Sequence, residues 1–88
     1  MKLELTTPIT AHGEEINEIE IRDPTGKDVR ELGYPYQLNP DDSVKLLSAV
    51  VCKYITRLGN IPPSAVDSMT PPDLNMAGWM VARFFLGS

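Results

Sequence analysis

The chain has 88 residues, 42% of them hydrophobic and 23% charged, which is the composition of one small folded domain and excludes a disordered segment. Twelve acidic residues against eight basic ones leave a net charge of −4, the wrong sign for neutralising nucleic-acid phosphates, so we expect no nucleic acid among its partners. The first five residues already include an acid, and no run of 18 uncharged apolar residues occurs, so we expect neither export nor contact with a membrane.

The first segment has the alternation of a β-hairpin. Residues 3–9 place an apolar or β-branched side chain at every second position, the pattern of a strand with one solvated face. Residues 11–14 predict the turn, since the glycine there can adopt a positive φ. A second strand follows at residues 18–22, but Ile16 falls out of step with it, which predicts either a bulge near Asn17 or a late start of that strand.

Three later sites carry the signature of a helix N-terminus, a short oxygen-bearing side chain followed three residues on by an acid. They begin at Thr25, Asn39 and Thr70, and a proline stands in the first helical position at the second and third. We expect the three acids to cap helices rather than to catalyse a reaction. The predicted helices cover residues 26–32, 40–58 (ended by Gly59) and 71–86, with one short helical turn within 64–69.

These elements make the fold class α+β, an N-terminal β-hairpin followed by a short helix and two longer helices, in a single small domain over residues 1–88. We place an acidic hairpin at residues 1–23 and a helical part at residues 24–88. Residues 1–32 hold eight of the twelve acids, so the first part is a solvated acidic layer. Because two strands alone are marginal, residues 34–38 or a partner chain are candidates to complete the sheet.

No set of residues has the spacing of a catalytic or metal site. His12 lies in a turn without a positioned partner, and Cys52 lies on an apolar helix, where it is a small buried hydrophobe rather than a nucleophile. No serine has a neighbouring base, no glycine-rich loop could hold a phosphate, and residues 23–28 lack the oxygen ligands of a calcium loop. We therefore expect no enzyme, no metal and no other cofactor.

The helix predicted at residues 71–86 is apolar nearly all round, since only Asn75 and Arg83 are polar after Asp73. Its methionines and Trp79 could fill the core against the hairpin, as methionine often does. Alternatively they could form a surface that binds another protein, because Trp, Met and Arg are enriched where proteins meet. The excess of apolar surface favours the second interpretation. The candidate partner-binding residues are Met76, Trp79, Met80, Arg83 and Phe84.

A family resemblance covers most of the chain. The strand at residues 5–9, the turn glycine Gly13 and the stretch at residues 19–30 resemble the opening of the phage tail assembly chaperone E family, found in Mu-like and other contractile-tailed temperate phages. The most specific part is an Arg-x-Pro-Thr-Gly-x-Asp run, and the order of hairpin, short helix, longer helix and apolar final helix agrees beyond it. The matching motif residues, which we interpret as structural, are Arg22, Pro24, Thr25 and Asp28.

The resemblance implies a non-catalytic role. Chaperones of this family bind the long tape measure protein in the host cytoplasm before tail tube protein polymerises around it, and they are absent from the mature virion. They are made in a short and a longer form by ribosomal frameshifting, and the adjacent Phe84 and Phe85 are suggestive of a slippage site. The resemblance thus implies the tape measure protein as partner, with the frameshifted longer form and tail tube protein as further partners.

Other roles stay open beside this one. A small structural connector or tail completion protein would remain in the virion and join a neighbour's sheet through the hairpin edge. An inhibitor that mimics DNA fits least well, because four bases lie among the eight acids of residues 1–32. Self-association through the last helix, which would give a homo-oligomer, is a competing use of that helix.

Overall fold

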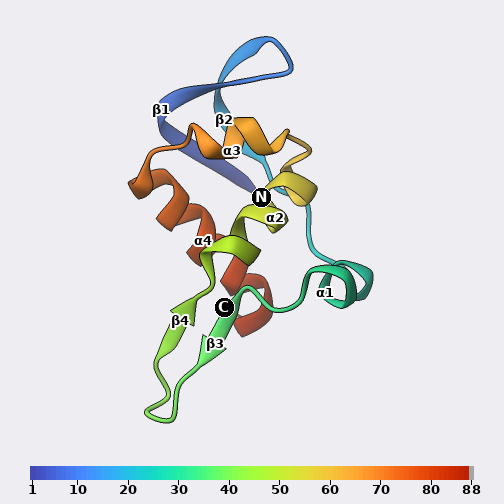
Figure 1. The fold of residues 1–88 in the computed structure, drawn as a ribbon, viewed down its shortest axis with the longest axis vertical. Coiled ribbons are helices and arrows are strands. Elements are labelled where there is room, and N and C mark those ends of the chain that lie inside the picture. Colours follow the sequence, from blue (N-terminus) through green and yellow to red (C-terminus); the bar gives the residue numbers. More distant parts are fainter. Residues whose placement is uncertain (88) are drawn as a thin grey trace.

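Two β-hairpins and four helices make up the structure, a computed structural model that describes residues 1–87 (Figure 1). The α+β class predicted from the sequence is confirmed, since a hairpin comes first and helices follow. The strands are β1 (Lys2–Ala11), β2 (Glu14–Glu20), β3 (Tyr36–Leu38) and β4 (Val44–Leu46), and the helices are α1 (Gly26–Leu32), α2 (Ser48–Gly59), α3 (Pro63–Asp67) and α4 (Pro71–Leu86).

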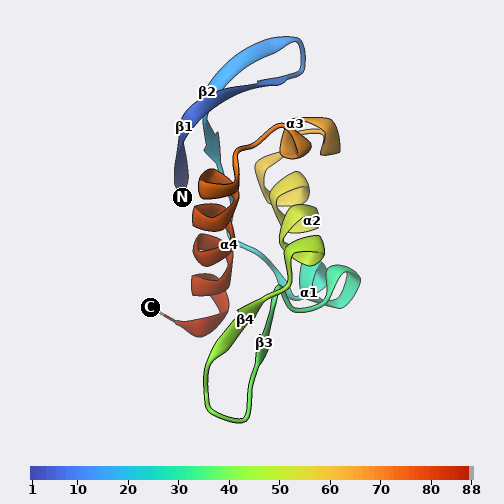
Figure 2. The same cartoon turned by 60° about the vertical axis from the view of Figure 1, so that its left-hand side comes forward.

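The N-terminal hairpin forms where the alternation predicts it. β1 and β2 pair antiparallel, and the last pair is Ala11 opposite Glu14. Only His12 and Gly13 remain in the turn, and both have positive φ values, 54° and 79°. This geometry matches the twist of the flanking strands, which confirms the predicted turn. The turn end of the hairpin extends beyond the helices in both views (Figures 1 and 2).

The irregularity predicted near Asn17 is present, and the extra residues lie on the first strand. Residues 5–8 of β1 stand opposite Asn17 alone, and regular pairing resumes at Ile9. A strand that bulges in this way leaves backbone N–H groups without a partner in the ladder. Such groups can form hydrogen bonds with acceptors outside the hairpin.

The carboxylate of Asp73, in the first turn of α4, accepts hydrogen bonds from this segment. The Thr6 N–H lies 3.0 Å from both carboxylate oxygens, the Thr6 hydroxyl 3.0 Å from one, and the Thr7 N–H 3.3 Å from the other. Asp73 is fully buried, and burial by itself would raise its pKa, but the hydrogen bonds from Thr6 and Thr7 outweigh it and lower the pKa. The carboxylate therefore stays charged and holds β1 on α4.

The core lies where the hairpin, α2, α3 and α4 meet. β1 contacts α3 and α4, β2 contacts α2, and α2 packs along α4. Tyr54 of α2 is fully buried, and its hydroxyl donates a hydrogen bond to the carbonyl of Gly33, which ties α2 to the end of α1. The largest buried apolar side chains are Leu3, Ile19, Ile21, Val51, Tyr54, Ile55 and Val81.

The prediction of a helix over residues 40–58 is wrong at its start, since α2 begins only at Ser48. Residues 36–46 instead form a second hairpin, in which β3 pairs with β4. The Asp41 carboxylate accepts bonds from the N–H and the hydroxyl of Ser43, at 3.1 and 2.6 Å, and the Asn39 amide donates to that hydroxyl at 2.9 Å. Asn and Asp make such turns with the same side-chain chemistry that caps helices, and here the turn prevails.

Two smaller expectations also change. The strand proposed at residues 34–38 exists as β3, but it pairs with β4 and does not extend the first sheet. Gly59 does not end α2 by a left-handed conformation, because Asn60 takes that conformation with φ 52°. A side chain at Gly59 would place its Cβ 2.7 Å from Ile19, so this glycine lets α2 approach the hairpin closely.

We predict that Asp73→Ala lowers the free energy of unfolding by about 3 kcal/mol, since it removes the buried, charged acceptor of the hydrogen bonds from Thr6 and Thr7. Asp67→Ala, which removes an exposed acid from α3, is the matched control and should change stability by less than about 0.5 kcal/mol. Urea unfolding followed by circular dichroism measures both variants. Equal stabilities would contradict the role assigned to Asp73.

Candidate functional site

The outer face of α4 carries three large apolar side chains that stay exposed, those of Met76, Trp79 and Leu86. Its exposed residues, spaced by three or four positions, are Met76, Trp79, Arg83 and Leu86, and we call them the outer α4 face. Met76 is 52% exposed and Trp79 is 40% exposed. Ala77, Val81 and Ala82 are buried on the other side of this helix, which runs beside α2 (Figure 2).

The five residues predicted to bind a partner divide into two groups. Met76, Trp79 and Arg83 are exposed, whereas Met80 and Phe84 are half-buried and pack against the core. The expectation that methionine and tryptophan fill the core therefore describes Met80 but not Met76 or Trp79. Whether these residues bind a partner stays a prediction.

The sequence places α4 in this orientation through its cap and its small residues. Thr70 caps the helix by accepting a hydrogen bond from the Asp73 N–H, and Pro71 occupies the first turn, where no N–H is needed. Ala77, Val81 and Ala82 form the buried side of the helix. Because the buried side chains are mostly small, the larger Met76 and Trp79 are left on the opposite side.

The motif residues gather at the joint between α1 and α2. Thr25 and Asp28 form a reciprocal capping box at the start of α1. The Arg22 guanidinium binds both oxygens of Asp28, at 2.8 and 3.1 Å, and Arg57 of α2 reaches Asp28 at 3.3 Å and Glu31 at 2.7 Å. Asp28 is buried, and the hydrogen bonds from Arg22, with further bonds from Thr25 and Arg57, hold its pKa well below the usual range. This geometry supports the structural interpretation of the motif.

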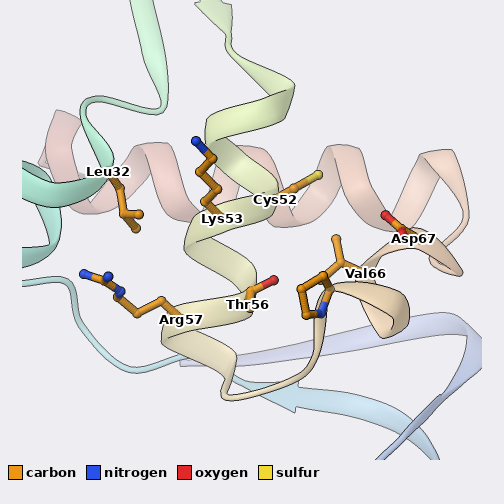
Figure 3. Close-up of a pocket in the computed structure, with 8 residues that line it drawn as sticks. Leu32, Cys52, Lys53, Thr56, Arg57, Val66 and Asp67 are labelled. Carbon is orange, nitrogen blue, oxygen red and sulfur yellow. The ribbon is translucent and has the colours of Figure 1, made fainter.

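A hollow of about 320 Å³ lies between α1, α2 and α3 (Figure 3). In that view Lys53 and Arg57 point toward α1, while the Cys52 sulfur points to the opposite side, where Asp67 lies. Burial raises the pKa of the half-buried Cys52 thiol, and the nearby Asp67 charge adds to the effect, so the thiol stays protonated at neutral pH. The hollow thus presents no activated nucleophile. Its lining residues are Leu32, Cys52, Lys53, Thr56, Arg57, Pro63, Val66 and Asp67.

The remaining candidates for chemistry have structural contacts. His12 is exposed in the hairpin turn, and its Nε2 lies 3.0 Å from the carbonyl oxygen of Asn60, so it links the turn to the end of α2. Among residues 1–87, no group of three or more His, Cys, Asp or Glu side chains is arranged to hold a metal ion. In the same part of the chain, none of the helices has the length and apolar character to span a bilayer.

Sequence reasoning missed an apolar surface on the second hairpin. The cross-strand pairs Tyr36–Leu46 and Leu38–Val44 put four apolar side chains on one face, and Leu38 at the outer end is 61% exposed. The aromatic rings of Tyr34, Tyr36 and Phe85 contact one another edge-on at the base of this hairpin. Apolar and polar residues alternate on both sides of the Asn-Pro-Asp-Asp turn, and this pattern could have revealed the hairpin.

Exposed methionine and tryptophan side chains on one helix face, as in this small acidic protein, are typical of surfaces that bind other proteins. Residues 2–86 match the family described as phage tail assembly chaperone proteins, E, or 41 or 14, and the chain belongs to this family. A search of curated proteins and a search of solved structures found no match. The resemblance seen in the hairpin and the motif is thereby confirmed, and a chaperone role in phage tail assembly follows from it.

We predict that acid destabilises the protein partly through Asp28. Because its pKa is lower in the folded state, the folded protein binds fewer protons, and the stability from Asp28 is lost as the pH falls below an unfolded pKa of about 3.9. Asp28→Asn should lower the free energy of unfolding by about 2 kcal/mol near pH 7, because the uncharged amide loses the charge-assisted hydrogen bonds from Arg22 and Arg57. It should lose less further stability on acidification than the parent chain.

Urea unfolding at neutral and acidic pH measures this dependence. Asp67→Asn removes an equal charge from the exposed surface of α3 and serves as the control. If the parent chain and Asp28→Asn lose stability equally on acidification, Asp28 does not carry the pH dependence.

Proposed function

We propose that this protein is a non-catalytic chaperone that binds the tape measure protein in the host cytoplasm and keeps it soluble until tail tube protein polymerises around it. Membership of the tail assembly chaperone family supports the assembly role. The single observation that carries the binding site is the outer α4 face, where Met76 and Trp79 are exposed beside Arg83. These three residue types are enriched at the energetic centres of protein interfaces.

The partner suits such a face by its chemistry. A tape measure protein is a long helical polymer, and its apolar stripes would aggregate before assembly unless another protein covered them. An amphipathic helix can lie along a second helix with its apolar side buried between them. Methionine adapts to partners of varied shape because its side chain is flexible and polarisable, so one face can cover many segments of a long client.

The acidic hairpin would supply solubility to the complex. Glu14, Glu15 and Glu18 are exposed on the first hairpin, whose turn end extends beyond the helices (Figure 1). Like charges on successive copies repel and keep a coated client dispersed. Tail tube protein would then displace the chaperone, which would be absent from the mature virion. A longer form, made by a frameshift near Phe84 and Phe85, would act together with the short form. This frameshift requires a slippery run of nucleotides at the Phe84 and Phe85 codons.

A structural connector retained in the virion is the second candidate. β1 and β2 form a sheet of two strands, so each strand keeps an edge without a strand partner among residues 1–87. Such an edge can accept a strand from a neighbouring protein. Detection of the protein in purified particles by mass spectrometry would favour the connector, and its absence there favours the chaperone.

We predict that Trp79→Glu abolishes capture of the tape measure protein. The protein is co-expressed with the tape measure protein of its own phage and captured by an affinity tag. Light scattering then measures the molar mass of the soluble complex. A charged side chain in the centre of the outer α4 face should reduce the captured partner at least about tenfold. Because Trp79 is partly exposed, the helix content measured by circular dichroism should not change.

Leu38→Glu is the matched control, because Leu38 is also a large exposed apolar residue but lies on β3. It should capture the partner as the parent chain does. Undiminished capture by Trp79→Glu would remove the outer α4 face from the binding site. A tape measure protein that is soluble alone and is not captured by the parent chain would overturn the chaperone function.

A further inference from the structure

A separate apolar cleft lies where the start of α2, β4 and α4 meet. Its volume is about 230 Å³, and it is distinct from the hollow beside α1. In both overall views β4 runs directly into α2 beside the middle of α4 (Figures 1 and 2). The residues that line the cleft are Leu46, Ser48, Val51, Pro71, Leu74, Asn75 and Gly78.

Gly78, in the interior of α4, is part of the lining of the cleft. A Cβ at Gly78 would lie 2.9 Å from Cδ1 of Leu46, so the leucine side chain rests directly on the helix backbone. Glycine inside a helix is unfavourable by about 1 kcal/mol relative to alanine, so its presence here has a packing reason. Leu46 and Leu74 line the cleft together with this glycine.

The chemistry of the cleft fits one apolar side chain. No lining residue is charged, and the only polar side chains are those of Ser48 and Asn75, both exposed. Small-molecule pockets usually begin at about 300 Å³, so a cleft of about 230 Å³ is better matched by a single inserted side chain than by a cofactor. An apolar side chain placed there exchanges contact with water for contact with Leu46, Val51 and Leu74.

The cleft is continuous with the outer α4 face. Asn75 forms part of its lining, is the neighbour of Met76 and lies one helical turn before Trp79. Between residues 74 and 86 the only charged side chain is Arg83, although the protein as a whole has a net charge of −4. The charge that α4 itself carries after Asp73 is therefore positive, and it complements an apolar segment that carries an acid rather than a base.

We infer that the cleft is an anchor site for the client, occupied by an apolar side chain of an acidic amphipathic helix that lies along α4 with a carboxylate near Arg83. This inference rests on the proposed function and adds to it the chemistry by which client segments are selected. A segment with a leucine, methionine or phenylalanine one or two turns from an aspartate or glutamate satisfies both requirements.

Large side chains introduced at the exposed lining residues Ser48 and Asn75 would fill the cleft and so test the inference. Ser48→Phe places a ring in the cleft from the first turn of α2, and Asn75→Phe does so from α4. Ala49→Phe adds the same ring to the next exposed residue of α2, which does not line the cleft, and is the matched control. Each variant is co-expressed with the tape measure protein and captured by its tag, and circular dichroism and urea unfolding verify the fold.

We expect both cleft-filling variants to capture at least about tenfold less tape measure protein, the loss that corresponds to one apolar side chain returned to water. Ala49→Phe should stay within about twofold of the parent chain, because it leaves the cleft open. A client peptide in which the anchoring residue is changed to aspartate should lose binding to the parent chain equally. This pattern establishes the cleft as the anchor.

Other outcomes overturn the inference and remain distinct from failure of the proposed function. If Trp79→Glu abolishes capture while Ser48→Phe and Asn75→Phe capture normally, the client binds the outer α4 face and not the cleft. Equal losses in Ser48→Phe and Ala49→Phe would show that the cleft is not specifically required. Light scattering of the chaperone without its client measures self-association. If Ser48→Phe lowers that mass but captures the tape measure protein normally, a second copy and not the client occupies the cleft.

Discussion

The contact between Asp73 and the irregular segment of β1 determines how the two ends of the chain meet. One buried carboxylate accepts bonds from the backbone of Thr6 and Thr7, which the pairing with β2 leaves unsatisfied. The contact fixes the start of α4 against the hairpin, and Ala77, Val81 and Ala82 then face the core while Met76 and Trp79 stay exposed.

The protein separates two kinds of surface along its length. The acids concentrate on the first hairpin and α1, whereas residues 74–86 carry only Arg83 among charged residues. A face that binds apolar segments is prone to self-association, and an acidic surface on the same molecule opposes it by repulsion. A chaperone needs both properties, because it must hold an insoluble client without aggregating.

The sequence predicts the first hairpin, its turn, α1 and α4 correctly, because alternation, a turn glycine and capping pairs are local signals. It fails over residues 40–47, since Asn39 and Asp41 have side chains that serve a tight turn and a helix cap equally well. The uncovered Met76 and Trp79 follow from the excess of apolar residues in α4. The cleft beside Gly78 depends on the approach of Leu46 from β4, which no local pattern reveals.

The hydrogen bonds between Thr6 and Asp73 join residues 67 positions apart, and this separation orders the events of biosynthesis. The hairpin leaves the ribosome long before α4 is made, and its irregular segment then has no acceptor for the N–H groups of Thr6 and Thr7. Contacts between distant residues must wait for chain closure, so the hairpin docks only after residue 73 has emerged. α4 follows every other described helix and strand along the chain, so its outer face forms after the hairpin on which it is docked.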